Sequence, residues 1–193
     1  EHYERVLQLY DRQRHKELAL YLGVDPAVLV SVLSGWSLWL AGRPDQARSR
    51  TRQGLDWGRE VGHIFSQGFP AFNAAQVPLW CGDLDDAERL ITESLNLGHE
   101  YGLPRYVTLG EILQTCLQVQ RGEPEGEHSL LRENLTQYSA LRTLSGLPLH
   151  FGAVADAYGR LGCVEEGLVV IEEAVRMTET QAGVFWAAEL WRL

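Results

Sequence analysis

Apolar residues recur every three to four positions along most of the chain, as Val28, Val32 and Trp36 do. This spacing places them on one face of an α-helix, and the strict alternation of a half-buried strand is absent. The pattern therefore predicts an all-α protein built of helix pairs. We expect first helices near 26–41, 64–81, 104–121 and 146–161, second helices near 44–61, 84–101, 124–141 and 164–180, and single helices near 2–10 and from 184. Residues 11–25 fit no pair and are expected to form a connector, with or without one short helix.

A glycine recurs every 40 residues, between the two predicted helices of each pair. The four are Gly42, Gly82, Gly122 and Gly162. An acid follows each glycine by three residues, at Asp45, Asp85, Glu125 and Glu165. Glycine ends a helix readily because it adopts the left-handed backbone conformation, and the helix dipole stabilises an acid in the next first turn. Since one such pair cannot bury its apolar faces alone, the repeat predicts an α-solenoid of stacked pairs.

The repeat divides the chain into a short first part and an array. Residues 1–25 are expected to be the end of a preceding repeat plus the connector, and 26–193 the helical repeat array. The repeats are expected near 26–63, 64–103, 104–143 and 146–182, with a truncated last helix over 184–193. Because the chain begins without Met and ends in an apolar run, we expect it to be an excerpt of a longer protein.

The segments GRPDQA (42–47) and GDLDDA (82–87) resemble the tetratricopeptide repeat. That repeat has a glycine between its helices and an alanine five residues later, which Ala47 and Ala87 match and Glu127 and Gly167 do not. The resemblance implies an α-solenoid of tetratricopeptide-like helix hairpins. The period here is longer than the usual repeat of about 34 residues, so these would be long-helix variants.

A second resemblance covers nearly the whole chain. The strings YDRQRH (10–15), GVDPAV (23–28), LWLAGRPDQA (38–47) and AYGRLGCVEEGL (157–168) resemble the C-terminal repeat region of bacterial multidomain predicted ATPases of the STAND type. Many of those proteins carry an adenylate/guanylate cyclase domain or a DNA-binding domain upstream. The resemblance implies a region that senses or docks, while ATPase or cyclase domains outside this chain perform the chemistry.

Charge and cysteine content narrow the classes of partner and compartment. The formal net charge is −9, which argues against a direct nucleic-acid or anionic-membrane partner held by bulk charge. Three widely spaced cysteines argue against a disulfide framework and favour the cytoplasm. The longest apolar stretch, 27–41, is shorter than the about 20 residues of a membrane span, so it is expected to be a buried helix.

Catalytic and metal-binding motifs are absent. The sequence has no GxGxxG, GxxxxGK, CxxC, HExxH or GxSxG string, and none of its six histidines is paired four residues from another. We therefore expect no catalytic residue, cofactor or metal in this chain.

Aromatic residues gather on the predicted first helices. In tetratricopeptide arrays those helices line the concave groove, so the resemblance implies an aromatic groove with a few polar groups. The candidate groove residues are Trp36, Trp39, Phe69, Phe72, Asn73, Gln76 and Trp80. Such a surface suits a peptide, an amphipathic helix or a small hydrophobic ligand. The alternative is that the aromatic residues are packed core.

Five arginines make the predicted helix 44–61 and the residue before it locally basic. They are Arg43, Arg48, Arg50, Arg52 and Arg59. Arg48, Arg52 and Arg59 are a candidate docking patch for an acidic partner, which another domain of the same polypeptide could supply. The alternative is an ordinary solvated outer face.

Two further features carry structural predictions. Pro70 and Pro78 fall inside the predicted helix 64–81, so that helix is expected to start late or to bend near Ala74. The last apolar run lacks the polar cap of a solenoid end and is expected to dimerise or to pack on a neighbour. Its large side chains are Phe185, Trp186, Leu190 and Trp191.

Taken together, the residues and the resemblance favour a non-catalytic protein- or peptide-binding or sensor module of a larger bacterial signalling or transcription-regulating protein. The first alternative is a small-molecule effector domain that uses the aromatic groove. The second is a structural spacer, which predicts that packing consumes the aromatic side chains entirely.

Overall fold

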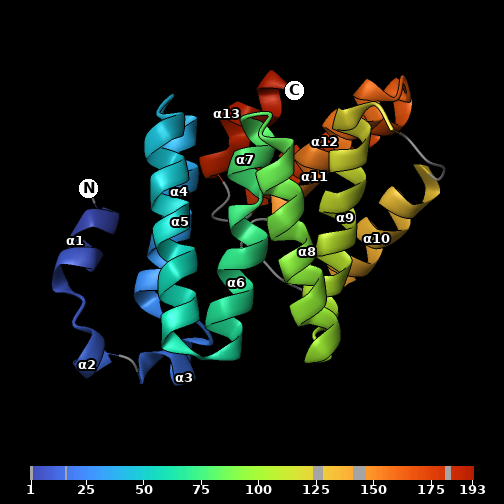
Figure 1. Ribbon diagram of the computed structural model, residues 1–193. Helices are drawn as coiled ribbons and strands as arrows, with labels where there is room; N and C mark the ends of the chain where they lie inside the picture. The colour runs from blue at the N-terminus through green and yellow to red at the C-terminus, as the bar shows by residue number, and fades with distance from the viewer. Residues whose placement is uncertain (1, 16, 124–127, 141–146, 181–183) are drawn as a thin grey trace. The chain divides into compact units, whose positions relative to one another are not determined.

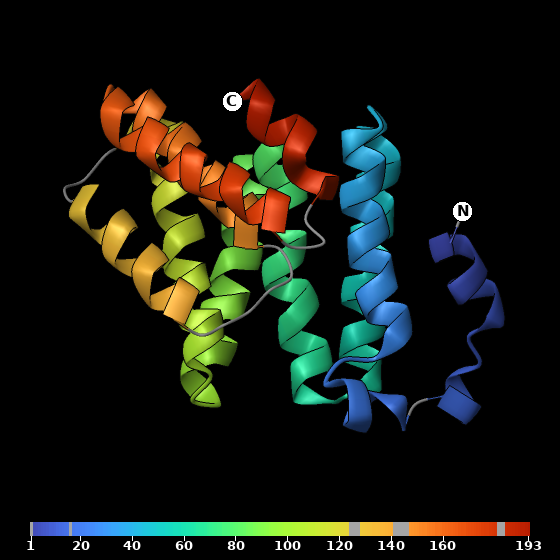
Figure 2. The same ribbon diagram turned by 180° about the vertical axis from the view of Figure 1, so that it is seen from behind.

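The computed structural model describes residues 2–15, 17–123, 128–140, 147–180 and 184–193 (Figures 1 and 2). All regular elements in these ranges are α-helices. They are α1 (His2–Leu9), α2 (Arg12–His15), α3 (Leu18–Leu22), α4 (Pro26–Leu40), α5 (Pro44–Val61), α6 (Ile64–Ala74), α7 (Gln76–Trp80), α8 (Leu84–Glu100), α9 (Pro104–Arg121), α10 (His128–Ala140), α11 (Leu147–Arg160), α12 (Val164–Thr180) and α13 (Val184–Arg192). None of the described helices is both long enough and apolar enough to span a membrane.

The expected helix positions agree closely with those observed. The all-α prediction is confirmed over the described residues, and α4, α5, α8, α9 and α12 begin where the apolar spacing placed them. The connector contains two short helices, α2 and α3. The expected second helix of the third pair is described from His128 onward, and residues 124–127 and 141 lie outside the described residues.

The four glycines spaced 40 residues apart all have the backbone conformation that the sequence predicted. Gly42, Gly82, Gly122 and Gly162 have φ angles of 73°, 71°, 74° and 76°. Gly42 joins α4 to α5 and Gly162 joins α11 to α12. A side chain at such a φ is strained, so these positions require glycine to turn the chain between helices.

The first compact unit spans Glu1–Tyr106. Within it α4 packs along α5, α6 packs on both helices of that hairpin, and α8 packs on α6, as the neighbouring ribbons in Figure 1 show. Small residues let the helices approach closely. A Cβ atom on Gly35 would collide with the Thr51 side chain, and one on Gly54 would lie 3.1 Å from Ser31 Cβ. Tight packing of this kind places the core between the hairpin and the next helix.

The helix with two internal prolines is interrupted where the sequence predicted a bend. The helix α6 ends at Ala74 and α7 begins at Gln76. Pro78 has no N–H to donate to the carbonyl of Ala74, so the helical hydrogen-bond ladder cannot continue unbroken. Asn73 sits just before the break, and its carbonyl accepts a hydrogen bond from Trp36 Nε1 at 3.0 Å.

The second compact unit spans Val107–Leu193. Within it α11 and α12 form a hairpin and α13 packs on both of its helices (Figure 2). The α10 helix packs on α11, where the rings of Tyr138 and His150 meet edge to face at 5.3 Å. Leu109, Ile112 and Val154 are among its fully buried core residues. Both units therefore share one packing motif, in which a helix hairpin is covered by the first helix of the next pair.

Candidate functional site

Most of the candidate groove residues are packed inside the first unit. Trp36, Phe72, Asn73 and Gln76 are buried, with exposed fractions between 0% and 3%. Two hydrogen bonds tie this set to the backbone of α6: the one from Trp36 to Asn73, and a second from Asn73 Nδ2 to the Phe69 carbonyl at 2.7 Å. These four side chains therefore act as core in the isolated chain and present little surface to a ligand.

The other three candidate groove residues remain partly accessible. Trp39 on α4 and Trp80 on α7 are half-buried and stack with ring centroids 4.4 Å apart. Phe69 on α6 is also half-buried. Since ring stacking consumes one face of each indole, the surface that a partner could contact here is small.

The candidate docking patch on α5 is largely occupied by acids of the same chain. Arg48 Nη1 lies 3.3 Å from Asp83 on the α7–α8 turn, and Arg59 Nη2 lies 2.8 Å from Glu93 on α8. Arg52 is exposed. An acidic partner would have to compete with Asp83 and Glu93 for two of the three cations, which weakens the argument for docking here.

Two features of the described residues bear on metal binding and on nucleophilic chemistry. Within the described ranges, no three His, Cys, Asp or Glu side chains are grouped as a metal site would require. Cys116 is buried on α9, where its thiol donates to the Ala153 carbonyl at 3.6 Å. Burial, reinforced by the charge of Asp156, raises the pKa of this thiol to about 12. A thiol that stays protonated is a poor nucleophile.

Asp25 is a buried acid, and its role is structural. It is 1% exposed and caps the first turn of α4 by accepting from the backbone N–H groups of Ala27 and Val28 at 2.9 and 3.3 Å. The Tyr10 hydroxyl donates to its other oxygen at 2.5 Å. Burial and this contact with Asp25 raise the pKa of Tyr10 above its ordinary value. The pair therefore fixes the connector to the start of the first hairpin.

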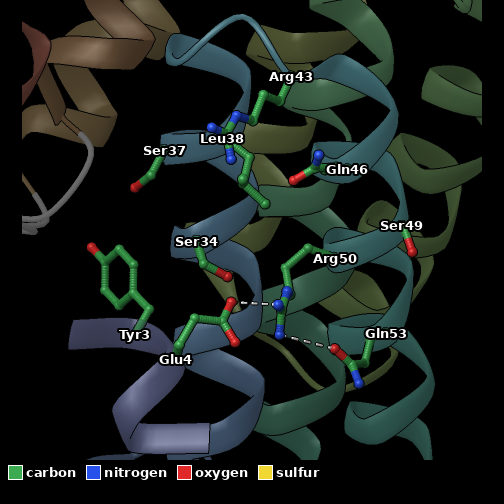
Figure 3. Close-up of a pocket in the computed structure, with 10 residues that line it drawn as sticks. All are labelled: Tyr3, Glu4, Ser34, Ser37, Leu38, Arg43, Gln46, Ser49, Arg50 and Gln53. Carbon is green, nitrogen blue, oxygen red and sulfur yellow. Dashed lines mark hydrogen bonds and ion pairs between the residues drawn. The ribbon is translucent and has the colours of Figure 1, made fainter. Parts of the chain in front are cut away.

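The described part of the first unit also contains a polar cleft that the sequence did not reveal. It lies between α1 and the α4–α5 hairpin and has a volume of about 670 Å³ (Figure 3). Ten residues line it: Tyr3, Glu4, Ser34, Ser37, Leu38, Arg43, Gln46, Ser49, Arg50 and Gln53. Its volume falls within the range of about 300–1,000 Å³ typical of small-molecule sites, and Leu38 is its one aliphatic lining residue.

Arg50 is the central charged group of the cleft. Its Nη2 donates to Glu4 Oε1 at 2.5 Å and its Nη1 to Gln53 Oε1 at 3.4 Å, as the dashed lines in Figure 3 show. The Arg50 side chain is 22% exposed and that of Glu4 is 55% exposed. The side chain of Arg43, the residue just before α5, also lines the cleft and makes no hydrogen bond or ion pair with any described residue. The lining of the cleft therefore contains two cationic side chains and one anionic side chain.

Sequence reasoning missed this cleft because its parts are distant along the chain. Glu4 and Arg50 are 46 residues apart, and the first helix carries no motif that indicates an ion pair. One local signal was present. Arg43, Gln46, Arg50 and Gln53 follow a 3–4–3 spacing, which places them along one face of a helix.

Comparisons with known proteins add little about function. No protein-family model matches the chain, and no solved structure matches it. An uncharacterised protein of Rhizobium meliloti (strain 1021) is 20% identical to it over 187 residues, which cover 96% of this chain and 18% of that protein. The chain thus spans less than a fifth of the length of this relative.

Proposed function

We propose that the chain is a non-catalytic recognition module built as an α-solenoid of tetratricopeptide-like hairpins with a period of about 40 residues. Two observations support the repeat. The four glycines 40 residues apart have nearly identical φ angles. In each compact unit, a hairpin is also covered by the first helix of the next pair: α6 covers α4–α5, and α13 covers α11–α12.

Burial at equivalent positions of the repeats supports the tetratricopeptide-like packing. Five residues after the glycine, Ala47, Ala87 and Gly167 are all buried. The corresponding Glu127 lies outside the described residues. Twelve residues after the glycine, the buried residues are Gly54, Ser94, Asn134 and Ala174. Small side chains at these positions let the two helices of a hairpin approach closely.

The polar cleft between α1 and the α4–α5 hairpin carries the proposal of ligand recognition. It combines a volume of about 670 Å³ with charged and amide groups, and the side chains of Arg43 and Gln46 there make no hydrogen bond or ion pair with the described residues. The lining is more polar than that of most small-molecule sites, so the ligand that it suits is small, polar and charged. We assign the module a sensor role, in which a ligand bound in the cleft biases the attached domains of a larger bacterial signalling protein.

Protein or peptide docking is the second candidate function. The stacked pair of Trp39 and Trp80 and the half-buried Phe69 on α6 favour it, because aromatic side chains are enriched among the residues that dominate binding at protein interfaces. The burial of the other candidate groove residues leaves this aromatic surface smaller than the sequence suggested.

Calorimetric titration tests the proposal. The chain is titrated with fractions of a bacterial metabolite pool and, separately, with a peptide library. We expect a saturable, stoichiometric signal from a metabolite fraction, with the compound recovered chemically unchanged. Gln46→Trp, which fills the cleft from its exposed α5 wall, should abolish the signal. Gln114→Trp, at an exposed position of α9, should not.

Three outcomes would contradict the sensor role. Chemical conversion of the bound compound would make the chain an enzyme. A saturable signal from peptides alone would assign it to docking. If neither the metabolite pool nor the peptide library gave a saturable signal, the chain would be assigned the role of a structural spacer.

A further inference from the structure

We propose that the cleft between α1 and the α4–α5 hairpin recognises a small di- or tricarboxylic acid, and that Glu4 occupies part of this site as an internal carboxylate. The inference rests on the proposed sensor function and specifies the ligand class for the same cleft. It starts from the group that the cleft already holds, a carboxylate on the Arg50 guanidinium.

The first step concerns Arg50. It is the less exposed of the two arginines that line the cleft, and its side chain is aimed between Glu4 and Gln53 (Figure 3). A guanidinium presents paired N–H donors that match the two oxygens of a carboxylate. The Glu4 carboxylate that meets it is more than half exposed, so a dissolved carboxylate can reach and replace it.

The second step concerns the other cation. Arg43 precedes Arg50 by seven residues, which is about two helical turns and about 10 Å along the helix axis. Arg43 is the residue just before α5, and both arginines line the same cleft, with Gln46 between them in the sequence as an amide donor. No described residue forms a hydrogen bond or ion pair with the Arg43 side chain. Two cations separated in this way fit a ligand with acidic groups at both ends better than they fit a single small anion.

The third step concerns charge. The chain carries a formal net charge of −9, and Asp83 on the α7–α8 turn and Glu93 on α8 already neutralise Arg48 and Arg59. The cleft lining has two arginines against one glutamate, so it is locally positive on an acidic protein. Displacement of Glu4 by a ligand carboxylate leaves both arginines available to the ligand. Attraction at this range is local and weakens with added salt.

Binding of defined probes tests the inference. Succinate, citrate, acetate and inorganic phosphate are titrated into the full chain by calorimetry at low ionic strength. We expect citrate and succinate to bind with one-to-one stoichiometry and acetate to bind at least about tenfold more weakly, because it engages one cation only. Raising the ionic strength well above the physiological value should weaken binding of both polycarboxylates, because salt screens their attraction to the arginines.

Matched variants assign the binding to the cleft. Arg50→Gln and Arg43→Gln should each weaken citrate binding by about tenfold or more, whereas Arg52→Gln, on an exposed part of α5 outside the cleft, should change it less than about twofold. Glu4→Gln removes the internal competitor. It should strengthen binding by up to about fivefold, which is the Boltzmann factor of an exposed ion pair worth up to about 1 kcal/mol.

Several results would overturn the inference. Equal losses in the Arg52 and Arg50 variants would show a diffuse charge effect. Weaker binding by Glu4→Gln would make Glu4 a structural part of the site. Phosphate binding as tightly as citrate, or binding of acidic peptides without binding of citrate or succinate, would point to another ligand. If no carboxylate binds while the metabolite pool still gives a signal abolished by Gln46→Trp, this inference fails and the sensor proposal stands. Unchanged thermal unfolding midpoints confirm that each variant is folded.

Discussion

At the scale of single residues, Trp36 shows how one side chain joins two helix pairs. Its ring is buried between α4 and α6, and its Nε1 donates to the Asn73 carbonyl just before the break between α6 and α7. The aromatic residue that the sequence marked for a ligand therefore supports the interrupted helix instead. Its indole N–H satisfies a backbone acceptor that is buried from water.

Trp36→Phe tests this contact. The variant keeps an aromatic ring but removes the N–H donor, so we expect the free energy of unfolding to fall by about 1–3 kcal/mol. The measurement is urea unfolding followed by circular dichroism. Trp191→Phe is the control, because Trp191 is 76% exposed and its substitution should change stability by less than about 0.5 kcal/mol. Equal effects of the two changes would contradict the role of the Trp36 hydrogen bond.

At the scale of helices, the contact between α5 and α6 depends on a glycine. A Cβ atom at Gly58 would collide with the Ser66 carbonyl oxygen and would lie 2.9 Å from Pro70 Cγ. Because Pro70 lacks an N–H, that carbonyl has lost its usual helical donor four residues later. The proline and the glycine thus act together, since one alters the surface of α6 and the other lets α5 approach it.

Gly58→Ala is expected to destabilise the first unit by about 1–3 kcal/mol, the usual cost of overpacking a rigid contact. Gly159→Ala is the matched control. Gly159 is also helical, but a Cβ atom there meets nothing within 4 Å. The control should stabilise the protein by up to about 1 kcal/mol, because alanine favours the helix. Thermal and urea unfolding of both variants measure the difference. A neutral or stabilising Gly58→Ala would show that the two helices are not in tight contact.

At the scale of the whole molecule, the last helix leaves apolar surface uncovered. Trp186 and Leu190 are buried within the second unit, where Leu190 packs near Gly152, whereas Trp191 is 76% exposed and Leu193 is 45% exposed. The side chain of Phe185 lies outside the described residues. The apolar run therefore divides into an inner face, which contributes to the core, and a smaller outer face.

We expect this outer face to drive weak self-association of the chain. Sedimentation equilibrium should show an average mass that rises with protein concentration. Trp191→Ser should restore the monomer, because it removes the largest exposed apolar side chain of α13. Tyr21→Ser, at an 83% exposed position on α3, should leave association unchanged. A clean monomer of the unmodified chain at high concentration would contradict this prediction.

Local features of the chain decide where most of the helices begin, turn and break. These features depend on local causes: the spacing of apolar residues, a glycine at each turn that needs positive φ, and two prolines that cannot continue a hydrogen-bond ladder. Long-range packing, in contrast, makes Trp36 and Phe72 part of the core and brings Glu4 to Arg50, which is 46 residues away in the chain. Burial depends on which neighbouring helix covers a face, and no local pattern in the chain encodes a contact between elements so far apart.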